Sequence, residues 1–264
     1  MAHTIYDNFV LANEIEDQYN SLLDLSQFCT VDNSLVGTPG MKKKINVYSA
    51  TDGTEKLAMG AGNTKSIEVS YTDVEYEILM AQNRFEYFDE QEMTDPMLLQ
   101  TGVRHMAVDM FNTVNADVFA EFNKATQAVT GVSTFDFGAF VDAGALLNME
   151  NLENIEVFAW VHPTDMAAVR KALKEDLKYV ESFARTGYVG TVAGINLYTK
   201  KDAVAGTIVG GTREAVTLFN KKGTEVEQPA RSAEDANIRK NTIISRKYYL
   251  AALTDTTKAF KITK

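Results

Sequence analysis

The chain has 264 residues, of which 45% are hydrophobic, so it can bury a sizeable core in one large domain or two small ones. Its 26 Lys and Arg residues against 36 Asp and Glu residues give a net charge of -10. This balance argues against nucleic-acid binding as the main activity, because phosphate recognition needs clustered positive charge. The single cysteine, Cys29, excludes an intrachain disulfide and the cysteine-rich zinc modules.

Targeting and membrane signals are missing from the sequence. The first residues lack a basic region followed by an apolar core, and no stretch of about 18 apolar residues occurs. We therefore expect a soluble protein that is intracellular where it is made and has no membrane partner. His3, His105 and His162 lie too far apart to form a local metal motif, and we expect neither a bound metal nor a cofactor.

The catalytic motifs are incomplete. The stretch Gly60–Lys65 lacks the third glycine of a dinucleotide loop and the Gly-Lys-Ser/Thr of a P-loop. Gly131-Val-Ser133 begins like a nucleophile elbow, but Phe135 takes the place of the closing glycine. His162 follows an apolar strand and precedes a proline, which is most often a turn position. We expect no catalytic residue and no enzyme activity.

Apolar residues near the N-terminus recur at roughly helical spacing with acids between them, which predicts an amphipathic helix on a polar arm. They are Leu11, Ile15, Tyr19, Leu22 and Phe28.

From Lys42 to Met80 the apolar residues alternate, which predicts a long β-hairpin with a Gly-rich connection over residues 50–66. The alternation changes phase beyond Asp73, as a bulge or a change of sheet face would produce. The strand from Ile67 would extend about 45 Å at 3.3 Å per residue.

Thr94, Asp95 and Pro96 then supply an N-cap and a first-turn proline for a helix to about Ala125, also about 45 Å long. Its residues Met106, Met110, Val114 and Phe122 are expected to face a sheet. A compact chain of this size has a diameter of about 47 Å. The helix and the hairpin each reach that length, so we expect a flat or elongated molecule whose surfaces need neighbouring subunits.

The middle of the chain, from Phe135 to Ala215, alternates helices and strands. A helix over residues 137–147 precedes a strand over 155–161. The next helix, with Met166, Val169, Leu173 and Leu177 as its apolar positions, is capped by Thr164 or Asp165. Strands follow near 194–198 and 207–209. From Val216 the pattern is again β: a strand over 216–219, a turn over 221–223, and strands over 241–244, 248–253 and 258–263.

This order of elements resembles the major capsid (coat) proteins of tailed bacteriophages, which have the Hong Kong 97-like fold, in the class Caudoviricetes. The segments that carry the resemblance are Phe158-Ala-Trp-Val-His-Pro163, Gly187-Tyr-Val-Gly-Thr-Val-Ala-Gly-Ile195, and Tyr248-Tyr-Leu-Ala-Ala-Leu-Thr-Asp255. The resemblance implies an α+β fold divided into four parts. These are an N-terminal arm (1–37), an extended loop or E-loop hairpin (38–80), a peripheral domain (81–134 and 217–264, with a spine helix over 95–127) and an axial domain (135–216).

The resemblance also implies a structural function: self-assembly, as pentamers and hexamers, into an icosahedral head shell around double-stranded DNA that is enclosed without sequence-specific binding. The implied partners are further copies of the chain, a separate scaffolding protein and a portal protein. The implied location is the virion, with assembly in the host cytoplasm. The acidic balance fits, because a shell that adhered to DNA would hinder packaging and ejection.

Charged residues on the hairpin and before the long helix are candidate intersubunit contacts. A solvated charge run is an equally good interpretation of the lysines at the hairpin base. Lysines near the tip are also candidates for the covalent Lys–Asn crosslinks of some relatives, although no acid partner is identifiable. The candidates are Lys42, Lys43, Lys44, Lys56, Lys65, Glu75, Glu77, Asp89, Glu90 and Glu92.

Two alternatives stay open. An encapsulin-type bacterial nanocompartment shell protein shares the fold and a similar length but encloses protein cargo. An α+β enzyme with a site around His162 and the 187–194 loop would instead be a monomer or small oligomer with a deep pocket.

Overall fold

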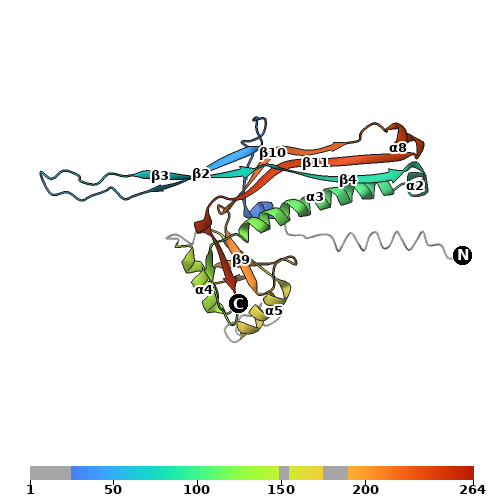
Figure 1. The fold of residues 1–264 in the computed structure, drawn as a ribbon. Coiled ribbons are helices and arrows are strands. Elements are labelled where there is room, and N and C mark those ends of the chain that lie inside the picture. Colours follow the sequence, from blue (N-terminus) through green and yellow to red (C-terminus); the bar gives the residue numbers. More distant parts are fainter. Residues whose placement is uncertain (1–24, 149–154, 175–189) are drawn as a thin grey trace.

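The protein is an α+β structure in which a long, flat upper layer carries a compact lobe on its lower side (Figure 1). The computed structural model describes residues 25–148, 155–174 and 190–264. The amphipathic helix expected near the N-terminus, residue Leu177 and part of the 187–194 loop lie outside the described residues.

A four-stranded sheet with the order β1-β10-β11-β4 forms the upper layer. β1 is parallel to β10, and the other neighbours are antiparallel. Its strands are β1 (Thr30–Asp32), β4 (Leu79–Phe88), β10 (Val216–Glu227) and β11 (Lys240–Leu253). Three short helices adjoin these strands: η1 (Leu25–Phe28) before β1, α2 (Asp89–Thr94) after β4, and α8 (Ala233–Asn237) between β10 and β11.

The long helix α3 (Leu98–Phe122) runs beneath this sheet without a break, as its apolar spacing predicts (Figure 1). It begins later than predicted, because Asp95 forms a turn before the helix instead of capping it: the Asp95 carboxylate accepts a 3.0 Å hydrogen bond from the Met97 N–H. Gly102 does not interrupt the helix. It allows close approach of the sheet, since a Cβ there would lie 2.5 Å from the ring of Phe85.

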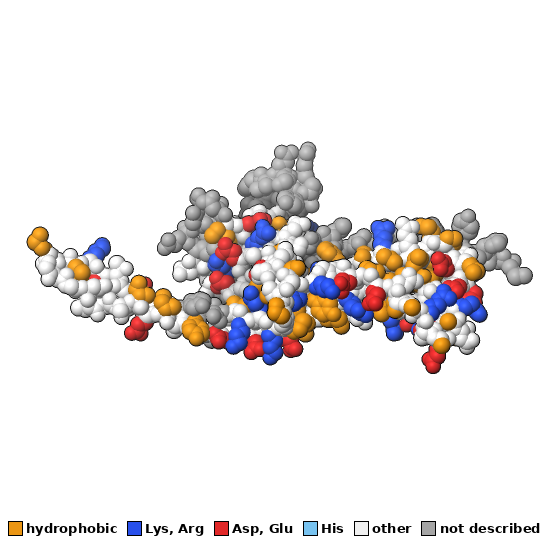
Figure 2. Space-filling model, turned by 90° about the horizontal axis from the view of Figure 1, so that it is seen from above, with side chains coloured by type: hydrophobic (Ala, Val, Ile, Leu, Met, Phe, Trp, Pro, Cys, Tyr) orange, Lys and Arg blue, Asp and Glu red, His pale blue; other side chains and the backbone are white. Residues whose placement is uncertain are grey.

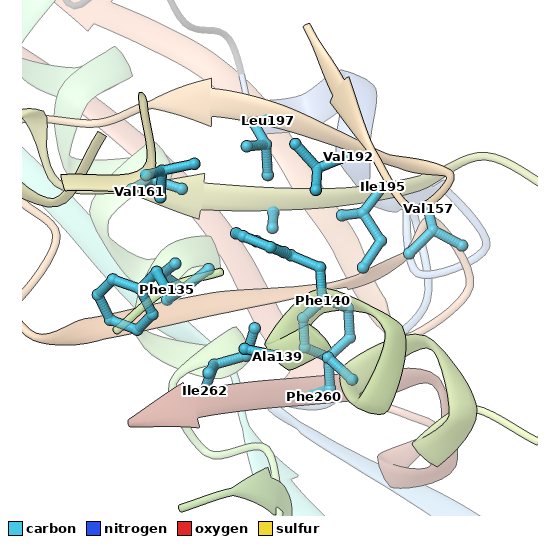
Figure 3. Close-up of a cluster of buried hydrophobic side chains, with 14 of the residues drawn as sticks. Phe135, Ala139, Phe140, Val157, Val161, Val192, Ile195, Leu197, Phe260 and Ile262 are labelled. Carbon is cyan, nitrogen blue, oxygen red and sulfur yellow. The ribbon is translucent and has the colours of Figure 1, made fainter. Parts of the chain in front are cut away.

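A six-stranded sheet with the order β5-β12-β9-β6-β8-β7 forms the lobe. Its strands are β5 (Gln127–Val129), β6 (Val157–Val161), β7 (Thr191–Val192), β8 (Ile195–Thr199), β9 (Thr207–Thr212) and β12 (Ala259–Thr263). Helices α4 (Phe137–Leu146) and α5 (Pro163–Ala172) contribute to the core on one face of this sheet, and η3 (Thr256–Lys258) precedes β12. Figure 3 shows Phe140 of α4 among Ile195, Phe260 and Ile262 of that core.

The two sheets are joined by an aromatic cluster. Every residue of β6 is buried, and Phe158 and Trp160 belong to the cluster that also contains the end of α3. The ring centroid of Phe122 lies 4.8 Å from that of Trp160 and 5.7 Å from that of Phe158. Phe122 is buried, as expected, in the cluster that also contains Leu218 and Tyr249 of the upper sheet, and its ring contacts extend this cluster to β6 of the lobe.

Some local expectations differ from the structure. Of the two explanations for the change of phase at Asp73, the bulge is excluded, because Asp73 pairs with Asn46 in an uninterrupted register. The turn expected over residues 221–223 is a set of register shifts within one long β10, and the two strands expected after it are the single strand β11. β12, which belongs to the segment 217–264, pairs with β9 and β5 in the lobe.

Candidate assembly surfaces

The hairpin of β2 (Lys42–Ala50) and β3 (Val69–Glu77) projects beyond the rest of the molecule (Figures 1 and 2). The two strands pair only with each other. Ile67, Val69 and Tyr71 are 62%, 63% and 63% exposed. A two-stranded ribbon with apolar side chains in water is marginal by itself, so this surface is suited to a partner.

The base of the hairpin is fixed to the sheet. Ile78, between β3 and β4, is 3% exposed, and its N–H donates to the Met41 carbonyl at 2.8 Å. The Tyr76 hydroxyl donates to the Leu253 carbonyl at 3.2 Å, and the Lys43 ammonium lies 5.2 Å from the ring centroid of Phe219. These contacts set the direction in which the hairpin leaves the subunit.

The charged candidates at this base pair mostly within the hairpin. Lys42 forms a 2.9 Å ion pair with Glu75, and Lys44 lies 3.9 Å from Asp73. The hydrogen bond from Lys42 holds the pKa of the Glu75 carboxyl below its ordinary value. Glu77 lies opposite Lys42 in the backbone register of the two strands. Because these side chains are exposed, such pairs contribute little stability within the subunit.

The hairpin tip is ordered by its own polar groups. Glu55 accepts hydrogen bonds from the N–H and the hydroxyl of Thr64, and the Asn63 amide donates to the Gly53 carbonyl at 3.2 Å. Lys56 and Lys65 are both exposed here, as expected for tip residues. The proposed intersubunit contacts of these two lysines stay a prediction.

The acidic candidates lie at α2, at the opposite end of the upper layer from the hairpin (Figure 1). Asp89 pairs with Arg231 and accepts a 2.8 Å hydrogen bond from Asn241, and Glu90 pairs with Arg239. The Arg231 hydrogen bond lowers the pKa of the Asp89 carboxyl.

The sequence interpretation missed the two arginine partners, Arg231 and Arg239. They follow β10 in the chain, about 140 residues after the acids, and no local pattern links them to Asp89 and Glu90.

Glu92 is exposed at the same end of the upper layer. Contacts of Asp89, Glu90 and Glu92 with a neighbour's lysines remain a prediction.

His162, one of the features suggested for an enzyme, has a structural role. His162 is the N-cap of α5, where its Nδ1 accepts from the Thr164 N–H at 3.3 Å, so the cap is not Thr164 or Asp165. Asp165 is instead buried and accepts a 2.6 Å hydrogen bond from the Gly206 N–H. Among the described residues, no three His, Cys, Asp or Glu side chains are grouped to hold a metal ion, and none of the described helices is long and apolar enough to cross a membrane.

Comparison with known proteins gives no match to a family model and none to a curated sequence. Solved structures do match. The capsid structure of cyanophage P-SCSP1u aligns over 89% of this chain and 86% of its own, with a TM-score of 0.70 at 13% identity. The capsid protein of a native GTA particle aligns over 92% and 90%, with a TM-score of 0.69 at 15% identity. The chain has the Hong Kong 97-like fold.

Within the Hong Kong 97-like fold the similarity extends beyond phages. A virus-like particle from Pyrococcus furiosus aligns over 93% of this chain and 94% of its own, with a TM-score of 0.59 at 10% identity. Each of these alignments covers about nine-tenths of the chain.

Proposed function

We propose that this protein is the structural major capsid protein of a tailed phage and assembles into the icosahedral shell of the head. The observation that carries the proposal is the projecting hairpin, whose exposed apolar residues contact little of their own subunit. Such a ribbon on a Hong Kong 97-like subunit is suited to pack over a neighbour. The solved structures with the same fold, among them two capsids, support the same function.

The proposal includes partners and places. Copies of the chain form pentamers and hexamers, a separate scaffolding protein directs assembly, and a portal protein provides the site of DNA entry. The genome is enclosed without sequence-specific binding, which suits a chain of net charge -10. The protein is then found in the virion, after assembly in the host cytoplasm. It is not an enzyme, and His162 serves as a helix cap.

The proposed subunit division keeps the arm (1–37), the hairpin segment (38–80) and the axial segment (135–216) of the fold family. The peripheral segments 81–134 and 217–264 then contribute β5 and β12 to the lobe's sheet.

Electron microscopy and sedimentation of the expressed chain, with and without its neighbouring gene products, test the proposal. We expect closed shells that sediment far faster than a monomer. A chain that stays a monomer or small oligomer under every condition would contradict any shell function and favour the enzyme.

A second candidate is an encapsulin-type nanocompartment shell, and the similarity to the Pyrococcus furiosus virus-like particle favours it. The contents of the shells separate the two. Nuclease-protected DNA in particles from infected or induced cells supports the phage capsid, whereas a co-purifying protein enclosed in DNA-free shells supports the nanocompartment.

A further inference from the structure

The strand β12 contributes to two hydrophobic clusters at once. It lies between β5 and β9, and its residues Ala259, Phe260 and Ile262 are fully buried. Phe260 and Ile262 belong to the core of the lobe (Figure 3), whereas Ala259 belongs to the aromatic cluster that contains the end of α3. One short strand therefore packs both in the lobe and against the cluster at the end of the long helix.

Lys261, in the middle of β12, caps α3 from the lobe. Its ammonium donates a 2.7 Å hydrogen bond to the carbonyl of Asn123, the C-cap residue of that helix. The last carbonyls of a helix have no helical partner and carry partial negative charge, so a cation beside them is stabilising. The last turn of α3 contains no basic residue, and the Lys124 ammonium that follows pairs with Glu121. The cation at this helix end therefore comes from a strand 138 residues further along the chain.

Lysines also fix both ends of the strand. Before β12, Lys258 pairs with Glu214, which lies where the chain passes from β9 to β10. After β12, the Lys264 ammonium lies 3.4 Å from the carboxylate of Asp165 on α5. The Lys264 N–H also donates to the Gly206 carbonyl at 3.1 Å. Because both ends of the strand are held, the ammonium in its middle has a defined position relative to α3.

We propose that β12 is a coupling strap and that Lys261 is the positioning residue through which the lobe holds the last turn of α3. The aromatic cluster joins the same two parts through side chains, whereas Lys261 binds the backbone of the helix end. An opening of either element removes the partner of the other, so the last turn of α3 and β12 open as one unit. A displacement of the lobe is thereby transmitted to the helix beneath the upper sheet. The inference concerns a single subunit and does not depend on shell formation.

Hydrogen exchange of the full chain, followed by mass spectrometry, tests the coupling in both directions. Lys261→Met keeps a long side chain but removes the cation, and we expect exchange about tenfold faster both in β12 and in residues 117–123. Ala120→Gly weakens the last turn of α3 at an exposed position, and we expect exchange in β12 to become about fivefold faster.

The double variant separates the strap from the aromatic cluster. In the Lys261→Met background, Ala120→Gly should no longer change exchange in β12, because the bond that links the two elements is absent. Two matched controls carry the same substitutions elsewhere. Lys201→Met changes an exposed lysine in the turn after β8, and Ala107→Gly changes an exposed position nearer the middle of α3. Neither control should alter exchange in β12.

The proposal stands if Lys261→Met and Ala120→Gly each accelerate exchange in both elements, the double variant adds nothing in β12, and the controls leave β12 unchanged. It is overturned if each substitution affects only its own element. It is also overturned if Ala120→Gly still accelerates β12 in the double variant, which would assign the coupling to the aromatic cluster. An equal rise in the pairing of β4 with β11 reports global unfolding and overturns it as well. If Lys261→Met does not fold, Lys261→Gln replaces it in the same comparison.

Discussion

The phenol of Tyr249 on β11 donates a 2.6 Å hydrogen bond to the carboxylate of Asp117 on α3, which ties the sheet to the helix. Changing Tyr249 to Phe should lower the free energy of unfolding by about 1 to 2 kcal/mol at pH 7, since the bond has a charged acceptor. Urea unfolding measures the loss. Tyr248→Phe is the control, because Tyr248 points to the opposite face of β11 and should change little.

The same pair gives a pH dependence. Burial, with the hydrogen bond to Asp117, raises the pKa of Tyr249 above its ordinary value of about 10. A pKa raised by folding contributes stability below the unfolded pKa and loses it as the pH rises toward the folded pKa. The stability difference between the parent and Tyr249→Phe should therefore shrink above about pH 10. A difference that stays constant to pH 11 would contradict this.

Phe122 is fully buried between the helix and the lobe. Phe122→Ala should cost about 3 to 5 kcal/mol, because it leaves a cavity beside Trp160. Phe137→Ala is the matched control, since Phe137 is half exposed and its loss should stay within about 0.5 kcal/mol. Chemical unfolding followed by Trp160 fluorescence reports both. A loss below about 1 kcal/mol at Phe122 would mean that the two layers do not depend on this contact.

Gly210 of β9 lies where the backbone of β6 passes closely. A Cβ at this position would be 2.3 Å from the Phe158 carbonyl oxygen, and a paired backbone has no room to move. Gly210→Ala should therefore destabilise the lobe by about 3 kcal/mol or more, at the upper end for overpacking. Gly144→Ala is the control: it meets nothing within 4 Å in α4 and should stabilise by about 0.5 to 1 kcal/mol through helix propensity. Equal thermal midpoints of the two variants would refute the packing argument.

His162 is the N-cap of α5, so its substitutions should follow capping ability. His162→Ala should cost about 1 kcal/mol, whereas His162→Asn, which keeps an acceptor for the Thr164 N–H, should cost little. Thermal unfolding of both variants, with sedimentation of the assembled form, checks this. If Asn were as damaging as Ala, the ring would have a function other than capping.

The hairpin tip should stabilise the contact between subunits and contribute little to the folding of a single subunit. Ala50 and Val69 are register partners, so residues 51–68 can be replaced by Asn-Gly, which suits a two-residue turn. We expect a subunit whose unfolding free energy changes by less than about 0.5 kcal/mol, but which forms no closed shells or only fragile ones. Met59→Ser, at a fully exposed tip residue, keeps the length and is the control. Shells of normal stability from the shortened chain would show that the hairpin is not an intersubunit clamp.

Long periodic segments were predictable from the sequence. The spacing of Met106, Met110 and Val114 placed one helix from about residue 96, within two residues of its start, and the alternation from Lys42 placed the hairpin. Such patterns repeat over many turns or pairs, so single exceptions do not obscure them.

Features that depend on distant residues were not predictable. β12 pairs with β5 across more than 130 residues, and a short apolar strand contains no signal for its partner. Gly223 resembled a turn residue but lies within β10, where register shifts accommodate it. The pairing of Asp89 with Arg231 follows from the fold and not from spacing. His162 was predictable as a strand-end residue. Its function as the N-cap of α5 was not, because the hydrogen bond from the Thr164 N–H to its Nδ1 depends on the orientation of the ring.

The position of β12 imposes an order on biosynthesis. This strand lies between β5 and β9 in the six-stranded sheet, although it is made long after both. Until residues 259–263 have left the ribosome, β5 and β9 of a nascent chain therefore lack the strand that pairs with both of them. Exposed strand edges pair readily with other chains, so incomplete chains are prone to aggregation through β5 and β9. When β12 pairs with β5 and β9, the six-stranded sheet of the lobe becomes continuous.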